Sequence, residues 1–308
     1  MGRCAFYVRA ARPFTSAASL AFSGRYRVGF MHTTIAAGAL ALLVFTAGAA
    51  AQQKPALEPG AEELLAHRAV YDLQLAPSAG SRAIEAAQGR LVMEFSGSAC
   101  TGYETKFRQV ARLETRESDA RTIDLTSSTD EAGDGSRLRF RSVLRTGAGP
   151  DKVVEGEASN TDGRILISFK IPKGIYYMVP VQPVFPTAQM KRVIAAALAG
   201  QTTLELPLFD GSSDGITIYD TLAIIGARAE PAAADAAFPL LANGRPWPVT
   251  LSYFKYGQRG ERTPEYVLSF LLYDNGVSTR LKIDYGDFAL VGALSQIETL
   301  EPAQPCAR

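Results

Sequence analysis

The sequence predicts a mainly β protein, built as a long antiparallel meander that one amphipathic helix interrupts. Three observations predict this class. Apolar and polar residues alternate in several segments, as they do in strands with one buried face. Residue pairs that favour tight turns stand between those segments. Only one long segment has apolar residues at helical spacing.

The N-terminal segment predicts an export signal that is removed. An apolar run ends in Ala49-Ala50-Ala51 directly before Gln52, and it is too short to span a membrane comfortably. Met31 is an alternative to Met1 as the true start. We therefore expect residues 1–51 to be an extension and cleaved signal peptide, and residues 52–308 to form a single domain without a transmembrane anchor. An uncleaved anchor is the alternative.

The leader also decides the sign of the net charge. It carries five of the 32 basic residues and none of the 31 acidic ones, so the mature chain has 27 basic residues and a net charge of −4. Binding to nucleic acid depends on neutralising phosphates with lysine and arginine. A mildly acidic chain is therefore a poor candidate for a nucleic-acid partner.

The mature chain holds two cysteines, Cys100 and Cys306. An even count in an exported protein favours a disulfide, because the compartment outside the cytosol is oxidising. The bridge would close a loop of about 206 residues, for which chain entropy gives on the order of 5 kcal/mol as an upper figure. Two free thiols or a redox pair are the alternatives, although no C-x-x-C motif is present.

The strand predictions rest on alternation and on turns. Alternation is clearest in residues 91–95, 138–144, 266–272 and 281–290, the last with a bulge at Gly286-Asp287. Turn compositions occur at residues 131–135, 162–163 and 275–276. Strands such as residues 267–273 are apolar on both faces, which suits a thick core or a groove.

Three segments depart from this pattern. Residues 187–199 have apolar positions at i, i+3, i+4, i+7 and i+8, which predicts a helix capped by Thr187 and stopped by Gly200. Residues 229–239 are rich in alanine and proline and predict a mobile loop. Residues 62–66 predict a short helix before the first strand.

The motifs that could carry catalysis are weak. Residues 211–215 match the G-x-S-x-G pattern around Ser213, but strand-like residues follow it and the only mature histidine, His67, lies upstream. One histidine without a second ligand makes no typical metal site, so we interpret His67 as a surface or capping residue. We expect no enzyme activity, no cofactor and no metal, and we name no catalytic residue.

Two groups of acids are candidate sites. Asp210, Ser212 and Asp214 have the spacing of the start of a calcium loop, but position twelve is Thr221 instead of glutamate, which favours a hairpin turn. Asp284 and Asp287 flank the predicted bulge, and a paired-acid mechanism needs a separation that the sequence does not show.

Arginines and aromatic residues suggest surfaces. Arg137, Arg139, Arg141 and Arg145 lie on one side of a predicted strand, where they could bind an anionic headgroup or acids of a partner. Glu155 and Glu157 have matching spacing on the next strand, which favours cross-strand pairing instead. Tyr176-Tyr177 and Trp247 could line a groove, although burial at strand ends is the default interpretation.

Six gapped motifs follow one another along the chain. They are Ser-Gly-Ser-Ala-Cys-Thr-Gly-Tyr at 96–103, Phe-Pro-Thr at 185–187, Phe-Asp-Gly-Ser-Ser-Asp-Gly at 209–215, Pro-Trp-Pro-Val at 246–249, Tyr-Asp-Asn-Gly-Val-Ser at 273–278 and Asp-Tyr-Gly-Asp-Phe at 284–288. In that order they resemble the EipB family of bacterial cell-envelope integrity proteins, over about residues 62–306.

The resemblance implies a fold, a location and a role. It implies one large, highly curved antiparallel sheet, a β-spiral resembling an open barrel, with a disulfide to which Cys100 and Cys306 correspond. It implies a periplasmic, non-enzymatic role in envelope integrity, with a periplasmic tetratricopeptide-repeat protein as partner. The curved sheet is also similar to lipoprotein carriers, so a carrier of a lipid, acyl chain or lipoprotein in the concave face is the alternative.

Overall fold

The structure is a computed structural model that describes residues 64–77, 84–115, 120–147, 149–212 and 214–302. The predicted signal, Met31, Gln52, Ser213 and Cys306 lie outside the described residues. In the described part, the chain forms fourteen strands and two helices.

The N-terminal eight strands are β1 (His67–Leu75), β2 (Ile84–Ser98), β3 (Gly102–Thr115), β4 (Arg121–Glu131), β5 (Arg137–Arg145), β6 (Lys152–Thr161), β7 (Arg164–Ile171) and β8 (Tyr176–Val179). Helix α1 (Pro186–Leu198) follows. The remaining elements are β9 (Thr203–Leu208), β10 (Tyr219–Ile225), α2 (Ala233–Ala236), β11 (Trp247–Lys255), β12 (Tyr266–Leu272), β13 (Ser278–Asp284) and β14 (Ala289–Thr299).

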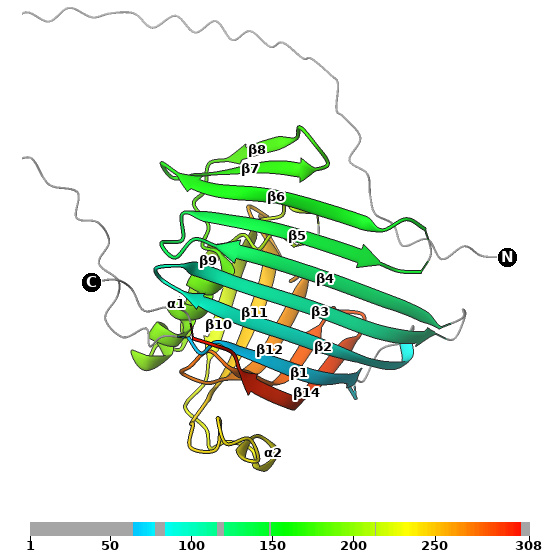
Figure 1. The fold of residues 1–308 in the computed structure, drawn as a ribbon, viewed down its shortest axis with the longest axis vertical. Coiled ribbons are helices and arrows are strands. Elements are labelled where there is room, and N and C mark those ends of the chain that lie inside the picture. The colour runs from blue at the N-terminus through cyan, green and yellow to red at the C-terminus, as the bar shows by residue number, and fades with distance from the viewer. Residues whose placement is uncertain (1–63, 78–83, 116–119, 148, 213, 303–308) are drawn as a thin grey trace, which may run out of the picture. The chain divides into compact units, whose positions relative to one another are not determined.

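All fourteen strands belong to one sheet, in the order β8-β7-β6-β5-β4-β3-β2-β1-β14-β13-β12-β11-β10-β9. Each strand is antiparallel to its neighbours. The chain runs from the centre of the sheet to one edge (β1 to β8) and then from the other edge back to the centre (β9 to β14), where β1 and β14 pair with each other (Figure 1). The predicted class, a large antiparallel β-sheet, is confirmed.

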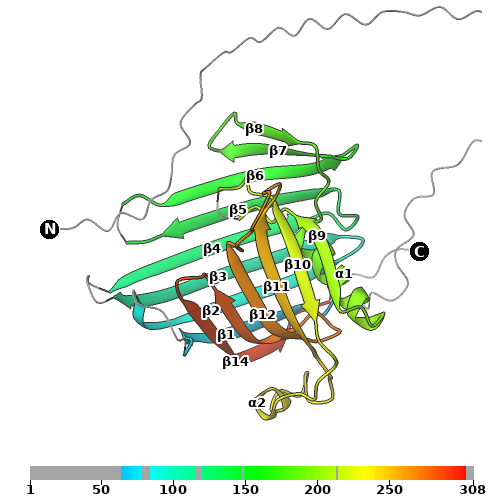
Figure 2. The ribbon, with the colours of Figure 1, turned by 180° about the vertical axis from the view of Figure 1, so that it is seen from behind.

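The sheet is highly curved, so that its two halves face each other. Strands β10–β12 lie across the face of β1–β4, in front of them in Figure 2 and behind them in Figure 1. Side chains from both halves form one buried cluster, which includes Leu91 of β2, Ala111 of β3, Val249 of β11 and Leu272 of β12. Burial of this apolar inner face is what favours the curvature over a flat, open sheet.

A second buried cluster lies on the inner face of β5–β7, and Phe209, Ile216 and Ile218 from the segment between β9 and β10 pack into it. Phe140 contacts Phe209 edge to face, with ring centroids 5.5 Å apart. Gly211 has φ of +68°, and a Cβ there would lie 2.4 Å from Cγ of Phe140. The glycine is therefore required both by the backbone conformation and by the close approach to the ring.

Helix α1 confirms the predicted amphipathic helix, but its N-terminal cap differs from the prediction. Phe185 is the N-cap residue and supplies no side-chain hydrogen bond, whereas Thr187 lies inside the first turn. Gly200, with φ of +71°, ends the helix as expected: its N–H and that of Gln201 donate to carbonyls of the last turn.

Three other predictions were wrong in detail. Residues 281–290 are two strands, since β13 ends at Asp284 and a turn, closed by Tyr285 N–H donating to Phe288 O, leads into β14. Residues 64–66 are not helical. The alanine-rich segment contains the short helix α2, and Asp235 within it is buried and accepts a hydrogen bond of 2.9 Å from Thr279 Oγ1. That contact anchors a segment expected to be a mobile loop.

Candidate interaction surface

The arginines of β5 lie on the outer face of the sheet. Side chains alternate along a strand, so Arg139 and Arg141 point away from the buried Leu138 and Phe140. The β5–β6 register places Arg139 opposite Glu157 and Arg141 opposite Glu155. The Nε atoms lie 3.0 and 3.3 Å from the respective carboxylates. The predicted cross-strand pairing is therefore confirmed for these two arginines.

Arg137, the third arginine of the predicted row, has no acid in its cross-strand position. It lies opposite Ser159. Its Nε atom is buried and has no hydrogen-bond partner among the described residues. The cross-strand ion pairs of β5 therefore begin two residues later, at Arg139.

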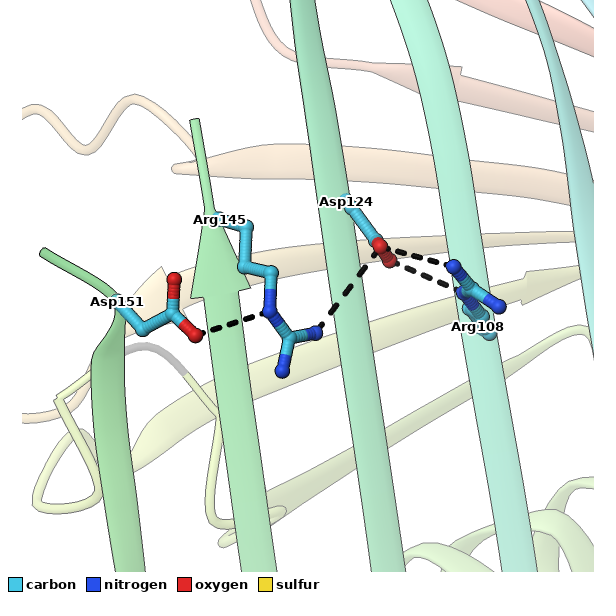
Figure 3. Close-up of polar contacts among 4 residues, drawn as sticks. All are labelled: Arg108, Asp124, Arg145 and Asp151. Carbon is cyan, nitrogen blue, oxygen red and sulfur yellow. Dashed lines mark hydrogen bonds and ion pairs between the residues drawn. The ribbon is translucent and has the colours of Figure 1, made fainter. Parts of the chain in front are cut away.

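A chain of ion pairs continues across β3, β4 and β5 (Figure 3). Arg108 donates to both carboxylate oxygens of Asp124, at 3.1 and 2.9 Å. Arg145 lies 4.0 Å from Asp124 and 2.9 Å from Asp151. The hydrogen bond from Arg108, and next its charge and that of Arg145, lower the pKa of the Asp124 carboxyl despite partial desolvation. Asp124 therefore stays ionised to a lower pH than an isolated aspartate does.

Between these pairs the outer face of β3–β7 is hollowed. A shallow, open hollow of about 540 Å³ is lined by side chains of both charges, among them Glu104, Asp130, Arg139, Arg141 and Lys170. A surface in which most charges already have a partner of opposite sign suits a protein surface with its own mixed charges, and suits a polyanion poorly.

Glu155 also lines this hollow. It accepts hydrogen bonds from Lys170 and Arg141, and these contacts, with Lys170 first, lower the pKa of its carboxyl. We call the outer face of β3–β7 that carries these pairs the charged face.

His67, the first residue of β1, is buried. Its side chain is 2% exposed, so the interpretation as a surface residue was wrong. Nδ1 lies 2.7 Å from the carbonyl oxygen of Leu65, to which it donates, and burial lowers the pKa of the ring. Within the described residues, no three His, Cys, Asp or Glu side chains are grouped so that they could hold a metal ion.

The acids between β9 and β10 organise a loop. Asp210 accepts a hydrogen bond of 2.9 Å from Ser212 N–H, and Asp214 accepts bonds from the N–H groups of Ile216 and Thr217. These are Asx turns, in which a side chain replaces a backbone acceptor. The segment then enters strand β10. A nucleophile elbow would require a helix at this point.

Asp284 has a similar local role. Its Oδ1 accepts from Gly286 N–H at 3.0 Å, and its other oxygen lies 3.3 Å from Lys282 Nζ. It therefore shapes the β13–β14 turn, and with Asp287 it flanks that turn instead of a bulge.

The aromatic candidates fall into two groups. Trp247 is buried, with the Arg228 guanidinium 4.0 Å above its ring, which agrees with the default interpretation. Tyr176 and Tyr177 are exposed, Tyr176 to 74%, so burial was the wrong expectation for them. The reason is that β8, which carries both, is the last strand of the sheet and has a neighbour on one side only.

Glu131 is a residue that the sequence did not single out. It ends β4, is 3% exposed, and accepts hydrogen bonds from the N–H groups of Thr187 (2.8 Å) and Ala188 (3.1 Å). A carboxylate at a helix N-terminus satisfies unpaired donors and interacts favourably with the helix dipole. Burial nevertheless raises the pKa of Glu131 above its usual value.

Lys191, one turn into α1, extends the same contact. Its Nζ donates to the Tyr103 hydroxyl and lies 4.3 Å from the centre of that ring. The helix is thus attached to both β3 and β4. No sequence signal marks this pairing, because Glu131 lies more than fifty residues before the helix it caps.

Cys100 lies in the exposed turn between β2 and β3, where Ser98 Oγ accepts hydrogen bonds from the N–H groups of Cys100 and Thr101. Its predicted partner Cys306 is outside the described residues, so the disulfide stays a prediction. The end of β14 lies at the same end of the sheet as this turn, since Thr299 is opposite His67 and His67 is opposite Phe95.

Comparison with known proteins places this fold and its motifs in one family. The sequence profile described as EipB-like matches residues 58–301. The cell envelope integrity protein EipB of Brucella abortus (strain 2308) is 35% identical over 240 residues, which cover 77% of this chain and 85% of that protein.

A solved structure agrees. The crystal structure of a β-barrel-like protein of the domain of unknown function DUF1849, from Brucella abortus, superimposes with a TM-score of 0.72 at 33% identity, over 78% of this chain and 99% of that chain. Among the described residues no helix is long and apolar enough to cross a membrane. With a matching profile over most of its length and a relative of this similarity, the chain belongs to the EipB-like family.

Proposed function

We propose that this protein supports the integrity of the bacterial cell envelope from the periplasm, without catalysis, by binding another protein. The relative named for envelope integrity supports the process. The charged face supports the mode: it is wide, hollowed and carries both signs of charge, which suits recognition of a folded protein surface. The mixed charge of this hollowed face is the observation that carries the proposal.

The partner we propose is a periplasmic tetratricopeptide-repeat protein, as the family resemblance implies. Repeat proteins of this kind present extended concave surfaces. The curved outer face of β3–β7 would meet such a surface with side chains such as Arg139, Glu157 and Lys170, which are all at least 40% exposed. The alternating signs would determine which partner fits and in which register.

Charge reversal tests this proposal in cells. A strain without the gene, complemented with the parent protein, should resist detergent and cell-wall antibiotics, whereas complementation with Arg139→Glu/Arg141→Glu should leave it sensitive. The matched control is Arg90→Glu, an exposed arginine that pairs with Asp72 on the outer face of β1–β2, away from the hollow. Equal resistance with all three proteins would contradict a role for the charged face.

Site-directed photocrosslinking identifies what is bound. A photoreactive residue at position 168, which lines the hollow, should crosslink one envelope protein in living cells, and the Arg139→Glu/Arg141→Glu variant should lose that product. If no specific product forms from position 168, the partner-binding proposal fails. A crosslinked product that is not a repeat protein would support the binding role and contradict the proposed class of partner.

The apolar inner face favours a second candidate, a carrier of a lipid, an acyl chain or a lipoprotein. Clusters on that face join both halves of the sheet through residues such as Leu91 and Val249, so a ligand would have to separate them. Native mass spectrometry of protein purified from its own periplasm distinguishes the candidates. Lipid-sized adducts would support the carrier, and a bare or protein-bound mass would support the partner-binding role.

A further inference from the structure

We propose that the free edge of β8 binds an extended segment of a partner protein by strand addition, and that this segment has an apolar centre between acidic ends. The inference rests on the proposed partner-binding function and specifies how a partner would attach. Three features of the β7–β8 hairpin carry it: exposed apolar side chains, unpaired backbone groups and the distribution of charge.

Exposed apolar side chains concentrate in this hairpin. Of the large apolar residues that are exposed in the described chain, more than half belong to residues 166–178: Leu166, Ile171, Ile175, Tyr176, Tyr177 and Met178. Met178 is 60% exposed and Tyr176 more so. Apolar side chains gathered at the surface in one hairpin are a feature that interaction sites share.

The backbone of β8 has one side without a partner. The sheet order ends at β8, and no described residue pairs with its far side. Phe169 N–H donates to Ile175 O, so Ile175 and Tyr177 point their polar groups toward β7. Because these groups alternate in antiparallel strands, the N–H and C=O groups of Tyr176 and Met178 point outward, where they can pair with an added strand.

The side chains beside that edge define the occupant. On the outer face Met178 lies opposite Leu166, and Tyr176 lies opposite Ser168. Arg164 lies at one end of this apolar row, with its guanidinium 3.9 Å from the sulfur of Met178. At the other end, Lys173 is exposed in the β7–β8 turn. An incoming strand with an apolar centre and an acid at each end is complementary to this arrangement.

The acids nearby do not cancel these charges. Glu155 is already engaged by Lys170 and Arg141, and within the described residues neither Arg164 nor Lys173 forms an ion pair with Asp162 or any other acid. A second copy pairing antiparallel at β8 would set the Arg164 end of one protomer beside the Lys173 end of the other. Those ends repel, so the charge distribution favours a different protein over a second copy.

The two terminal segments of the mature chain that lie outside the described residues are also poor occupants. Residues 52–63 contain Pro55 and Pro59, and residues 303–308 contain Pro305. Proline has no N–H to donate to a ladder and is confined to the edges and ends of strands. Each of these short stretches therefore lacks donors that strand addition requires.

A designed peptide tests the edge directly. The probe is fluorescein-labelled Asp-Thr-Val-Thr-Val-Thr-Val-Thr-Asp, titrated with the mature protein and followed by fluorescence anisotropy. We expect saturable binding that weakens at least about tenfold, the effect of 1.4 kcal/mol, when two central amides of the peptide are N-methylated. Replacing both terminal Asp residues by Lys should also weaken it. Absence of binding, or equal binding of the N-methylated peptide, overturns the proposal.

Two variants locate the binding on the protein. Met178→Pro removes an outward N–H without removing a hydrogen bond to β7, and Met178→Lys keeps the backbone and changes only the side chain. Both should weaken binding of the peptide. The matched control is Ile224→Lys, an exposed apolar residue on β10, which has a paired strand on each side. If Met178→Lys and Ile224→Lys bind the peptide as the parent does, the site is not at β8.

The outcomes separate this inference from the proposed function. A photocrosslinked partner that persists with Met178→Lys, together with unchanged peptide binding, overturns the edge and leaves the envelope role. Loss of the crosslink with both Met178→Lys and Met178→Pro supports the edge. A dimer of the parent in sedimentation that Met178→Lys abolishes would assign the edge to a second copy and overturn the proposed occupant.

Discussion

Two pairs of strands could close the sheet, β1 with β14 and β8 with β9, and only the first pair is hydrogen-bonded. At the first, β1 and β14 pair from His67–Thr299 to Leu75–Leu290, although they are the ends of the described fold. At the second, β8 and β9 are neighbours in sequence but lie at opposite ends of the strand order. The first is closed by a ladder with one register shift, between Val70 and Tyr71, and the second leaves two strand edges.

The two edges at the second place also differ from each other. β9 is covered: Val184 N–H donates to Pro207 O, Phe209 N–H donates to Val184 O, and α1 packs against the strand. No described residue covers the far side of β8 in this way. Proteins protect edge strands from unwanted pairing, so an edge left open and apolar is expected to have a use.

The largest expected effect concerns the closed side. Cys100→Ser or Cys306→Ser should lower the free energy of unfolding by about 2–5 kcal/mol, because the predicted disulfide ties the chain end beside β14 to the β2–β3 turn. Urea unfolding of the mature protein with and without reductant measures it. Superimposable curves would show that no such bridge stabilises the closed side.

The cover of the β9 edge depends on Glu131. Glu131→Ala should lower the free energy of unfolding by about 2–3 kcal/mol, because the N–H groups of Thr187 and Ala188 lose their buried acceptor. Urea unfolding followed by circular dichroism checks this. Asp130→Ala is the control: this neighbour is exposed, and its nearest cation is 3.9 Å away, so we expect a change below about 0.5 kcal/mol. Equal losses of unfolding free energy in the two variants would mean that substitution in β4 destabilises the strand, and that the loss does not come from the helix cap.

The pH dependence of the same residue has a definite sign. Burial raises the folded-state pKa of Glu131, so the folded protein keeps its proton to a higher pH than the unfolded chain does. The stability of the parent relative to Glu131→Gln should therefore fall as the pH rises from the usual glutamate pKa through the raised one. An increase over that interval would mean that hydrogen bonds to the ionised carboxylate outweigh the burial.

A smaller effect is expected on the charged face. The Arg108–Asp124 pair is partly exposed, so its coupling in a double-mutant cycle with alanine should be about 0.5–1 kcal/mol. The folded pKa of Asp124 is lowered, so this stabilisation is present above the usual aspartate pKa and is lost as the pH falls through the lowered value. Coupling that is unchanged by acid or by high salt would contradict an electrostatic origin.

The smallest expected effect is at the open edge. Met178→Lys should change the free energy of unfolding by less than about 0.5 kcal/mol, because the side chain is exposed and buries little surface. Urea unfolding measures it, with Phe185→Ala, a fully buried residue before α1, as the contrasting large loss. A loss of several kcal/mol for Met178→Lys would mean that β8 is covered in the folded protein, as β9 is.

The sequence by itself determined the fold class, the one long helix and the cross-strand charge pairs. Each depends on local periodicity: alternation placed Leu138 and Arg139 on opposite faces, helical spacing marked 187–199, and matching two-residue steps joined Arg139 and Arg141 to Glu157 and Glu155. The Asp162-Gly163 turn was equally local, because both residues need positive φ, which they have. Such features are determined by neighbours within a few residues.

Only the tertiary structure decided which residues are buried away from their local pattern, and which edge stays open. The capping of α1 by Glu131 and the burial of His67 depend on strands distant in sequence. The exposure of Tyr176 and Tyr177 follows from β8 being last in the strand order. Alternation specifies that a residue lies in a strand, but curvature and strand order determine what each face meets, and these are properties of the whole sheet.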